Sequence, residues 1–318
     1  MQFSKRAFSG VPRFDAAFRS NTRQEFRKAN ANRTKPLTAS DTLKKRNTSS
    51  PLKDPMYALR FLLLVLFVPL VQFAGGDEPI QLRILSYNIH HGEGIDGKLD
   101  LQRIANVILS VNPDLVALQE VDQNALRSES IDQPSELARL TKMHAAFGAN
   151  IPLQGGHYGN VVLSRFPIRK HANHLLPNIA NGEQRGYIEA TIEIPGAADP
   201  VVLMATHLDH RRDERERLES ANAINAKAKK QSQQIALLAG DMNAVPSSDT
   251  MQRLGAVWTS VSDTPMPTIP VTTPARQIDF ILYRPQQRWK VVEVNVLDEA
   301  VASDHRAIFA VLELQPAE

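Results

Sequence analysis

Cysteine is absent from the 318 residues of this chain. This absence excludes disulfide frameworks, catalytic thiolates, Cys-ligated zinc and iron–sulfur clusters, so a catalytic metal would need oxygen or imidazole ligands. The chain also lacks an apolar run of the roughly 20 residues that cross a bilayer, because its longest run covers only residues 61–71 and contains Pro69. No internal repeat is present in the sequence. The 42% of hydrophobic residues are nevertheless enough for a large folded domain.

Charge is distributed unevenly along the chain. Residues 1–76 contain 14 Lys+Arg and 4 Asp+Glu, which leaves 37 − 14 = 23 Lys+Arg and 34 − 4 = 30 Asp+Glu for residues 77–318. The second part therefore has a net charge of −7, whereas proteins that bind polyanionic DNA usually carry a basic groove. Nucleic acid stays open as a partner of residues 77–318, but their charge does not favour it.

Composition divides the chain into three segments. Residues 1–55 are rich in basic and small polar residues without helical or strand periodicity, which predicts a disordered extension. Residues 56–76 have the layout of a signal peptide, with an apolar run followed by Ala74 and Gly76. We therefore expect cleavage near Gly76, export to the periplasm or the cell exterior, and no stable transmembrane span after processing. An uncleaved anchor or a buried helix is the alternative for residues 56–76, and a translation start at Met56 also remains open. Residues 77–318 would form the catalytic domain.

Short apolar segments alternate with amphipathic ones from residue 82 onward. Helices are predicted at residues 101–111, where Asn112-Pro113 ends the helix, at 135–147, and as an exposed helix at 213–229. Apolar runs predict strands at residues 82–87, 115–118, 160–164, 187–194 (alternating, hence half-buried), 201–206, 235–239, 278–283, 289–296 and 307–314. This mixture indicates an α/β layered domain with mixed sheets.

Polar residues follow several of the predicted strands at the same position, just past the carboxyl end. They are Asn88, Glu120, His207, and Asp241 with Asn243. Such residues form one cluster if their strands lie side by side, which is where layered α/β domains place their sites. Asp279 instead begins an apolar strand, where a buried carboxylate needs a partner, and Asp304-His305 is the candidate for that partner.

Seven short motifs resemble, in order, those of the endonuclease/exonuclease/phosphatase superfamily of DNase I-like phosphoesterases. Each motif alone has low specificity, but the ordered set across about residues 82–314 is highly specific. They are Ser86-Tyr87-Asn88-Ile89-His90, Leu118-Gln119-Glu120-Val121, Gly159-Asn160-Val161-Val162-Leu163-Ser164-Arg165, Thr206-His207-Leu208, Gly240-Asp241-Met242-Asn243, Ile278-Asp279-Phe280 and Ser303-Asp304-His305. The resemblance implies a four-layered α/β sandwich in which two mixed β-sheets are flanked by helices.

The resemblance also implies a role for each site residue. Asn88, Glu120 and Asp304 would hold Mg²⁺ or Mn²⁺, which suits their hard oxygen ligands. Asp241 would orient or deprotonate the attacking water, and Asn243 and His207 would contact the phosphate. His305, held in its charged form by Asp279, would stabilise the pentacovalent phosphate or protonate the leaving group. Arg185 and Asn160 match positions that approach the substrate, although a surface ion pair and a strand-edge cap are the alternatives for these two residues.

Other hydrolase classes fit the sequence less well. Thr206-His207-Leu208-Asp209-His210 is similar to the zinc motif of metallo-β-lactamase-like hydrolases, but Ala205 replaces its first histidine. Gly240-Asp241-Met242-Asn243 is similar to calcineurin-like phosphoesterases, yet no Gly-Asn-His-Glu follows. The mixed-charge run 211–217 is predicted to be a solvated helix start, with Arg211 or Arg212 close enough to His207 to contact substrate.

The prediction is therefore an exported Mg²⁺-dependent phosphoesterase that is more suited to phosphodiesters than to phosphomonoesters. Small phosphodiesters and phospholipid head groups are slightly favoured over extracellular nucleic acid as substrates. The alternatives are a secreted endonuclease and a catalytically idle binding module on the same fold. The intact set of acids, amides and histidines argues against the idle module.

Overall fold

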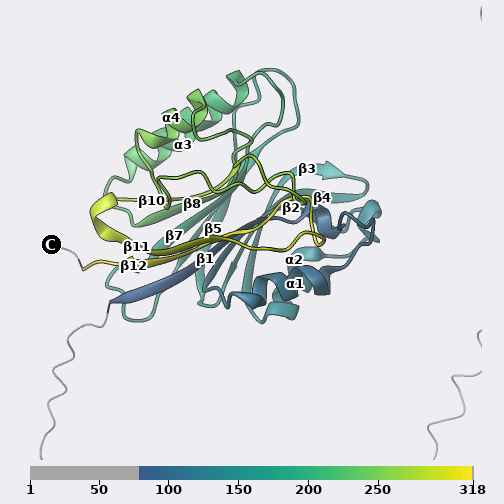
Figure 1. The fold of residues 1–318 in the computed structure, drawn as a ribbon, viewed down its shortest axis with the longest axis horizontal. Helices are drawn as coiled ribbons and strands as arrows, with labels where there is room; N and C mark the ends of the chain where they lie inside the picture. The colour runs from purple at the N-terminus through teal and green to yellow at the C-terminus, as the bar shows by residue number, and fades with distance from the viewer. Residues whose placement is uncertain (1–78, 317–318) are drawn as a thin grey trace, which may run out of the picture. The chain divides into compact units, whose positions relative to one another are not determined.

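Two six-stranded β-sheets lie face to face, and helices cover both outer faces (Figure 1). The computed structural model describes residues 79–316, so the predicted extension 1–55 and signal peptide 56–76 lie outside the described residues. From one outer side to the other, the layers are α3 and α4, the second sheet, the first sheet, and α1 and α2 (Figure 1). This arrangement confirms the predicted four-layered sandwich.

The first sheet has the strand order β11-β12-β1-β2-β4-β3. Within it β1 and β2 are parallel and the other pairs are antiparallel. The bounds are β1 Ile80–Asn88, β2 Leu115–Gln123, β3 His144–Leu153, β4 Gly156–Ser164, β11 Trp289–Val296 and β12 Ile308–Leu314.

The second sheet has the strand order β5-β6-β7-β8-β10-β9, with β7 and β8 as its parallel pair. A Cβ at Gly240 of β8 would collide with the carbonyl oxygen of Thr206, so glycine permits the close approach of this pair. The bounds are β5 Ile168–Leu175, β6 Gly186–Ile192, β7 Val201–His207, β8 Ala236–Asp241, β9 Thr259–Ser260 and β10 Asp279–Arg284.

Four α-helices and three short 3-10 helices connect the strands of the described residues. Side-chain caps begin three of the α-helices: Asp100 accepts from Arg103 N, Asp132 from Ser135 N and Ser248 from Met251 N. The bounds are α1 Leu101–Ser110, α2 Gln133–Thr141, α3 Arg215–Lys230, α4 Asp249–Gly255, η1 His90–Gly92, η2 Leu126–Ser128 and η3 Gln286–Arg288.

Apolar side chains fill the three spaces between the four layers. Ile84, Val162, Leu203 and Ile281 are fully or almost fully buried between the two sheets. A second cluster joins the first sheet to α1, and a third joins the second sheet to α3 and α4. These clusters hold the ends of the central strands in fixed relative positions.

Three predictions about individual elements were wrong. The helix predicted at residues 135–147 ends at Thr141, because Lys142 takes a left-handed φ of 58° and His144 begins β3, which pairs with β4. The strand predicted at residues 187–194 was expected to be half-buried, but every residue of β6 is buried. The reason is that α3 covers the outer face of β6, where Lys227 lies 3.2 Å from Glu189.

The helix predicted to be exposed is packed on one side. In α3, Ile224 is fully buried, and the charged residues Glu216 and Arg217 are each 4% exposed. Their charges bind backbone: Glu216 accepts from the N–H groups of Ile179 and Ala180, and Arg217 Nη1 donates to Asp209 O. The run 211–217 is therefore only partly solvated, and it connects three segments of the chain.

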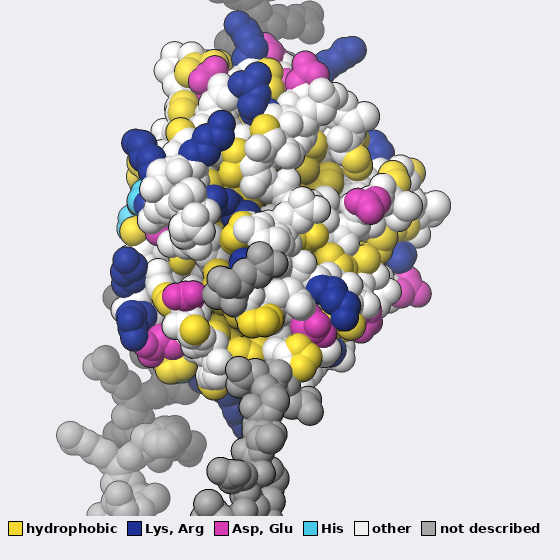
Figure 2. Space-filling model, turned by 90° about the vertical axis from the view of Figure 1, so that its left-hand side faces the viewer, with side chains coloured by type: hydrophobic (Ala, Val, Ile, Leu, Met, Phe, Trp, Pro, Cys, Tyr) yellow, Lys and Arg dark blue, Asp and Glu magenta, His cyan; other side chains and the backbone are white. Residues whose placement is uncertain are grey.

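The end of the sandwich opposite the central strand ends carries no large area of one charge (Figure 2). Figure 2 shows the end of the sandwich at which β1 begins, and basic, acidic and apolar side chains are interspersed there. Within residues 79–316, no helix is long and apolar enough to cross a membrane. The polar cluster described next lies at the other end, where β1 reaches Asn88.

Candidate functional site

The predicted polar residues meet at one end of the sandwich because the parallel strand pairs end there together. In the second sheet His207 of β7 is the register partner of Asp241 of β8, and Asp241 is in turn the antiparallel partner of Asp279. In the first sheet Asn88 ends β1 beside β2. Asn88 Nδ2 lies 3.2 Å from Asp241 Oδ2, so the two sheets contribute to one cluster.

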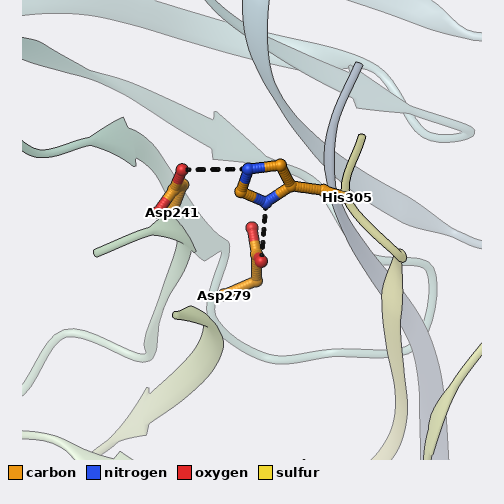
Figure 3. A group of neighbouring side chains, drawn as sticks. All are labelled: Asp241, Asp279 and His305. Atoms are coloured by element: carbon orange, nitrogen blue, oxygen red, sulfur yellow. Dashed lines mark hydrogen bonds and ion pairs between the residues drawn. The ribbon is translucent and has the colours of Figure 1, made fainter. Parts of the chain in front are cut away.

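His305 lies between two buried carboxylates (Figure 3). Its Nδ1 is 2.9 Å from Asp279 Oδ2, and its Nε2 is 3.8 Å from Asp241 Oδ2. Thr268 Oγ1 also donates to Asp279 Oδ2 at 2.5 Å, which fixes that carboxylate. Burial alone would lower the pKa of His305, but Asp279 and Asp241 raise it to about 10. The predicted partner of Asp279 is therefore His305, which is an imidazolium at neutral pH.

His207 has the opposite protonation state. Its Nδ1 is 3.1 Å from Arg185 Nη1 and its Nε2 is 3.0 Å from Asn243 Nδ2, and both of these partners are donors. Its Nε2 also lies 3.4 Å from Asp241 Oδ2. Burial, Arg185 and His305 hold the pKa of His207 well below its usual value. His207 is therefore a neutral imidazole beside Asp241.

Asp241 is the centre of the cluster. Its Oδ1 accepts from the backbone N–H of Asn243 at 2.8 Å, and Asn243 takes a left-handed φ of 47° that turns the chain back toward the strand end. Burial and the neighbouring Asp279 raise the pKa of Asp241 to about 7, although His305 lowers it. A carboxylate with this pKa can accept a proton near neutral pH.

Glu120 reaches the cluster through a bulge in β2. The pairing of β2 with β4 shifts register between Leu118 and Val121, and Glu120 takes a φ of 59°. A β-bulge redirects a side chain, and here the carboxylate is 2.9 Å from Asn88 Nδ2. Asp304 is exposed beside the cluster, and its neighbour Ser303 donates to Asn88 O at 2.7 Å. The structure thus places the three predicted metal ligands on adjoining segments.

Oxygen donors of this kind fit a divalent cation. Among residues 79–316, the Glu120 carboxylate accepts only from Asn88 Nδ2, so it is partly compensated, whereas Asp241 also accepts from Asn243 N–H. Asp241, Asp279 and His305 also place one ligand atom each within 4.8 Å of one another. A protonated His305 has no lone pair for a metal, however, so this second group is better suited to proton transfer.

Arg185 and Asn160 differ in their relation to the pocket beside this cluster. The pocket has a volume of about 290 Å³, and Arg185, Glu120, His207, Asp241, Asn243 and His305 are part of its lining. Arg185 is buried, pairs with Glu183 at 2.9 Å, and contacts both His207 and His210. Asn160 is 1% exposed and donates to Gly186 O at 3.0 Å, so its amide ties β4 to β6 across the sheets.

Six residues that line the pocket were not among the predicted site residues: Arg127, Ile151, Leu153, Tyr158, Glu183 and His210. Arg127 belongs to η2, Tyr158 to β4 and His210 to the loop after β7, and none follows a predicted strand directly. The charged pair Asp122 and Arg127, five residues apart, was the available sequence signal. Arg211 does not line the pocket and is instead held by Asp209 at 2.9 Å.

Comparison with known proteins agrees with this geometry. The family model described as "Endonuclease/Exonuclease/phosphatase family" matches residues 85–305. The uncharacterized protein YbhP of Escherichia coli K12 is 27% identical over 217 residues, which are 64% of this chain and 85% of YbhP. A solved endonuclease/exonuclease/phosphatase from Beutenbergia cavernae is similar with a TM-score of 0.65 and 28% identity, over 74% of this chain and 72% of that one.

A mannosyl-6-phosphatase from Bacteroides thetaiotaomicron has the same fold. Its TM-score is 0.62 at 17% identity, over 73% of this chain and 99% of that one. The fold therefore recurs in proteins with low sequence identity to this one.

Proposed function

The chain belongs to the endonuclease/exonuclease/phosphatase family, and from this premise we propose that it is a divalent-metal-dependent phosphoesterase that hydrolyses a phosphodiester by in-line attack of water. The observation that carries the proposal is the pair of histidines of opposite protonation state around Asp241. His305 is held charged by Asp279, and His207 is held neutral by Arg185. Both line the same pocket as Asp241.

Asp241 orients the attacking water and accepts its proton. The raised pKa of this carboxyl suits a general base near neutral pH, and the Asn243 N–H and Asn88 amide fix its two oxygens. As the water oxygen bonds to phosphorus, the opposite P–O bond breaks and the leaving oxygen takes up a proton from a solvent water.

Donors around Asp241 stabilise the charge that develops on the phosphoryl oxygens. His305 Nε2–H carries a positive charge because Asp279 holds the other ring nitrogen. The Asn243 amide supplies a neutral donor, and the neutral His207 ring lies 3.0 Å from it in the same pocket. Such preorganised donors contribute more in a buried site than in water.

Mg²⁺ or Mn²⁺ would be held by the carboxylates of Glu120 and Asp304 and by Asn88 through its Oδ1, the atom that accepts from His90 N in this structure. When bound, such an ion supplies a Lewis acid that polarises a phosphoryl oxygen. The partly compensated carboxylate of Glu120 supports this assignment. Asn160, predicted to bind substrate, is kept in the proposal as a positioning residue, because its amide holds Gly186 O next to Arg185.

We favour a small phosphodiester or a phospholipid head group over nucleic acid as the substrate. The pocket volume of about 290 Å³ suits a compact group. The net charge of −7 over residues 77–318 also opposes a polyanion. Export after cleavage near Gly76 belongs to the same proposal, and sequencing the amino terminus of the native protein would test it.

Hydrolysis of bis-p-nitrophenyl phosphate by the purified full chain tests the activity. We expect release of p-nitrophenol with Mg²⁺ or Mn²⁺, none with EDTA, and slower release from p-nitrophenyl phosphate. Asp241→Asn should lower kcat by about 10²–10⁴-fold, as for loss of a general base. Asp213→Asn, the same change at an exposed carboxylate, is the control.

Two results would contradict the proposal. Full activity of the double variant Asp241→Asn, His305→Ala would reject the roles of these residues. Absence of hydrolysis of both compounds with every metal would favour a binding module instead.

A further inference from the structure

Arg127 lies in the wall of the pocket and has no assigned part in the reaction. Its Nε and Nη2 donate to the two carboxylate oxygens of Asp122, each at 2.8 Å, and Asp122 is fully buried. The backbone N–H of Arg127 donates to Gln154 Oε1 at 2.7 Å. The guanidinium carbon is 5.3 Å from the ring centroid of Tyr158. The guanidinium is therefore held in one orientation without any substrate.

One edge of this guanidinium remains available. Nη1 of Arg127 donates to no group among residues 79–316, and the side chain is 32% exposed where it lines the pocket. A fork-shaped donor fixed by a buried carboxylate is well suited to binding an anion, because it loses little side-chain freedom on binding. An arginine that only neutralised Asp122 would not need to face the pocket.

The pocket contains a second basic group at the phosphate-binding side. Arg185 is buried and borders His207 and Asn243, which contact the scissile phosphate in the proposed reaction. The Tyr158 ring lies under the Arg127 guanidinium and lines the same pocket as Arg185. Ile151 and Leu153 of β3 add apolar surface to the same wall. Arg127 and Arg185 thus share one small pocket with an apolar surface, in which Glu183 pairs with Arg185 at 2.9 Å.

We infer that Arg127 recognises a second anionic group on the substrate, so that the substrate is a small phosphoester that carries a further phosphate or carboxylate. The inference rests on the proposed function, because Arg127 is assigned relative to the scissile phosphate. The apolar wall contacts the carbon skeleton between the two anionic groups. The pocket volume of about 290 Å³ limits that skeleton to a few carbon atoms or a single ring.

Binding of non-hydrolysable ligands tests the inference. Alkane bisphosphonates with two to four methylene groups are compared by calorimetry with alkylphosphonates of the same chain length, with and without Mg²⁺. We expect the full-length protein to bind at least one bisphosphonate about tenfold more tightly than its monophosphonate, as a charge-assisted hydrogen bond predicts. Arg127→Gln should reduce this preference to less than about twofold.

Two further variants separate recognition from folding. Arg127→Gln leaves the buried Asp122 without its partner, so the double variant Asp122→Asn, Arg127→Gln removes both charges and should also lose the preference. Arg139→Gln is the matched control, because Arg139 makes the same two-pronged contact with Glu136 outside the pocket. This control should keep the preference.

The inference is overturned if no bisphosphonate is preferred, if none of the ligands binds, or if the preference survives in both Arg127 variants. A ten-nucleotide oligothymidylate is also tested. If it binds more tightly than every bisphosphonate, and both Arg127 variants lose this binding, the inference of a small substrate is rejected in favour of a nucleic acid strand. The proposed function fails separately, through absence of bis-p-nitrophenyl phosphate hydrolysis. If the protein shows no hydrolysis but still has an Arg127-dependent preference for bisphosphonates, the anion-binding site is supported and the proposed phosphoesterase activity is rejected.

Discussion

His305 and His207 illustrate how one residue type acquires two states within a single site. Both rings are buried, and both lie beside Asp241. The charge of the second neighbour decides the outcome: His305 contacts the carboxylate of Asp279, whereas His207 contacts the guanidinium of Arg185. A carboxylate favours the charged imidazole and a guanidinium favours the neutral one.

The pKa of His305 should therefore depend on Asp279. We expect Asp279→Asn to lower the pKa of His305 by about 1–3, because an opposite charge in contact is lost while the shape is kept. Titration of the His305 ring resonances by NMR, in the protein without metal, measures this shift. Asp199→Asn, at a side chain 60% exposed, is the control. An unchanged titration of His305 would reject the pairing.

The same shift predicts how stability depends on pH. The pKa of His305 is raised from 6.5 to about 10, so its contribution to folding is present below about pH 6.5 and is lost as the pH rises toward 10. Urea unfolding at pH 6.5 and 9.5 should show a larger loss of stability for the natural protein than for Asp279→Asn. An equal loss in both proteins would contradict this prediction.

Among the elements, α3 connects the outer layer to the loops around the site. Glu216 binds the N–H groups of Ile179 and Ala180, and Arg217 binds Asp209 O. Because these charged groups are hydrogen-bonded to backbone, they can be buried. The helix can therefore pack on the second sheet although it carries few apolar residues. Ile224 supplies the apolar contact, and it is fully buried.

Truncation of Ile224 tests how firmly α3 is packed. Ile224→Ala should lower the free energy of unfolding by about 2–5 kcal/mol, as for other large core deletions. Lys229→Ala, on the exposed side of the same helix, should change it by less than about 0.5 kcal/mol. Urea denaturation measures both values. If the two variants have equal effects, α3 is not firmly packed on the second sheet, and the prediction of an exposed helix would be correct after all.

At the scale of the whole molecule, the site depends on the packing of one sheet against the other. Asn88 and Glu120 come from the first sheet, and Asp241 and Asp279 come from the second. The contact of Asn88 Nδ2 with Asp241 Oδ2 crosses between them. A cation held at this junction would stabilise the folded protein more than the unfolded chain, where its ligands are apart.

Metal binding should therefore raise the stability of the whole domain. At a Mg²⁺ or Mn²⁺ concentration about 100 times Kd, the expected gain is about 2.7 kcal/mol. Thermal unfolding with and without EDTA measures the gain. Glu120→Gln should reduce it, whereas Glu219→Gln, at an exposed glutamate of α3, should not. If the Glu120→Gln variant shows the same metal-dependent gain in stability as the natural protein, Glu120 is not a ligand of the metal.

Much of the fold could be predicted from the sequence because buried strands and capped helices have local signatures. The strands that contain Asn88, His207 and Asp241 were predicted from apolar runs, and Asn112-Pro113 was expected to end α1. Strand β5 was missed because only two of its eight residues are even partly buried, so it has no apolar run. Strand β3 was missed because much of its sequence also fits a helix.

The sequence by itself determined the α/β class, the order of the motifs and the set of acids, amides and histidines that follow the strands. It could do so because these features repeat along the chain with a fixed local pattern. Only the tertiary structure decided that Glu120 turns into the site through a bulge, that β6 is covered on both faces, and that Arg127 lines the pocket. These outcomes depend on contacts between segments far apart in the chain, which no local pattern encodes.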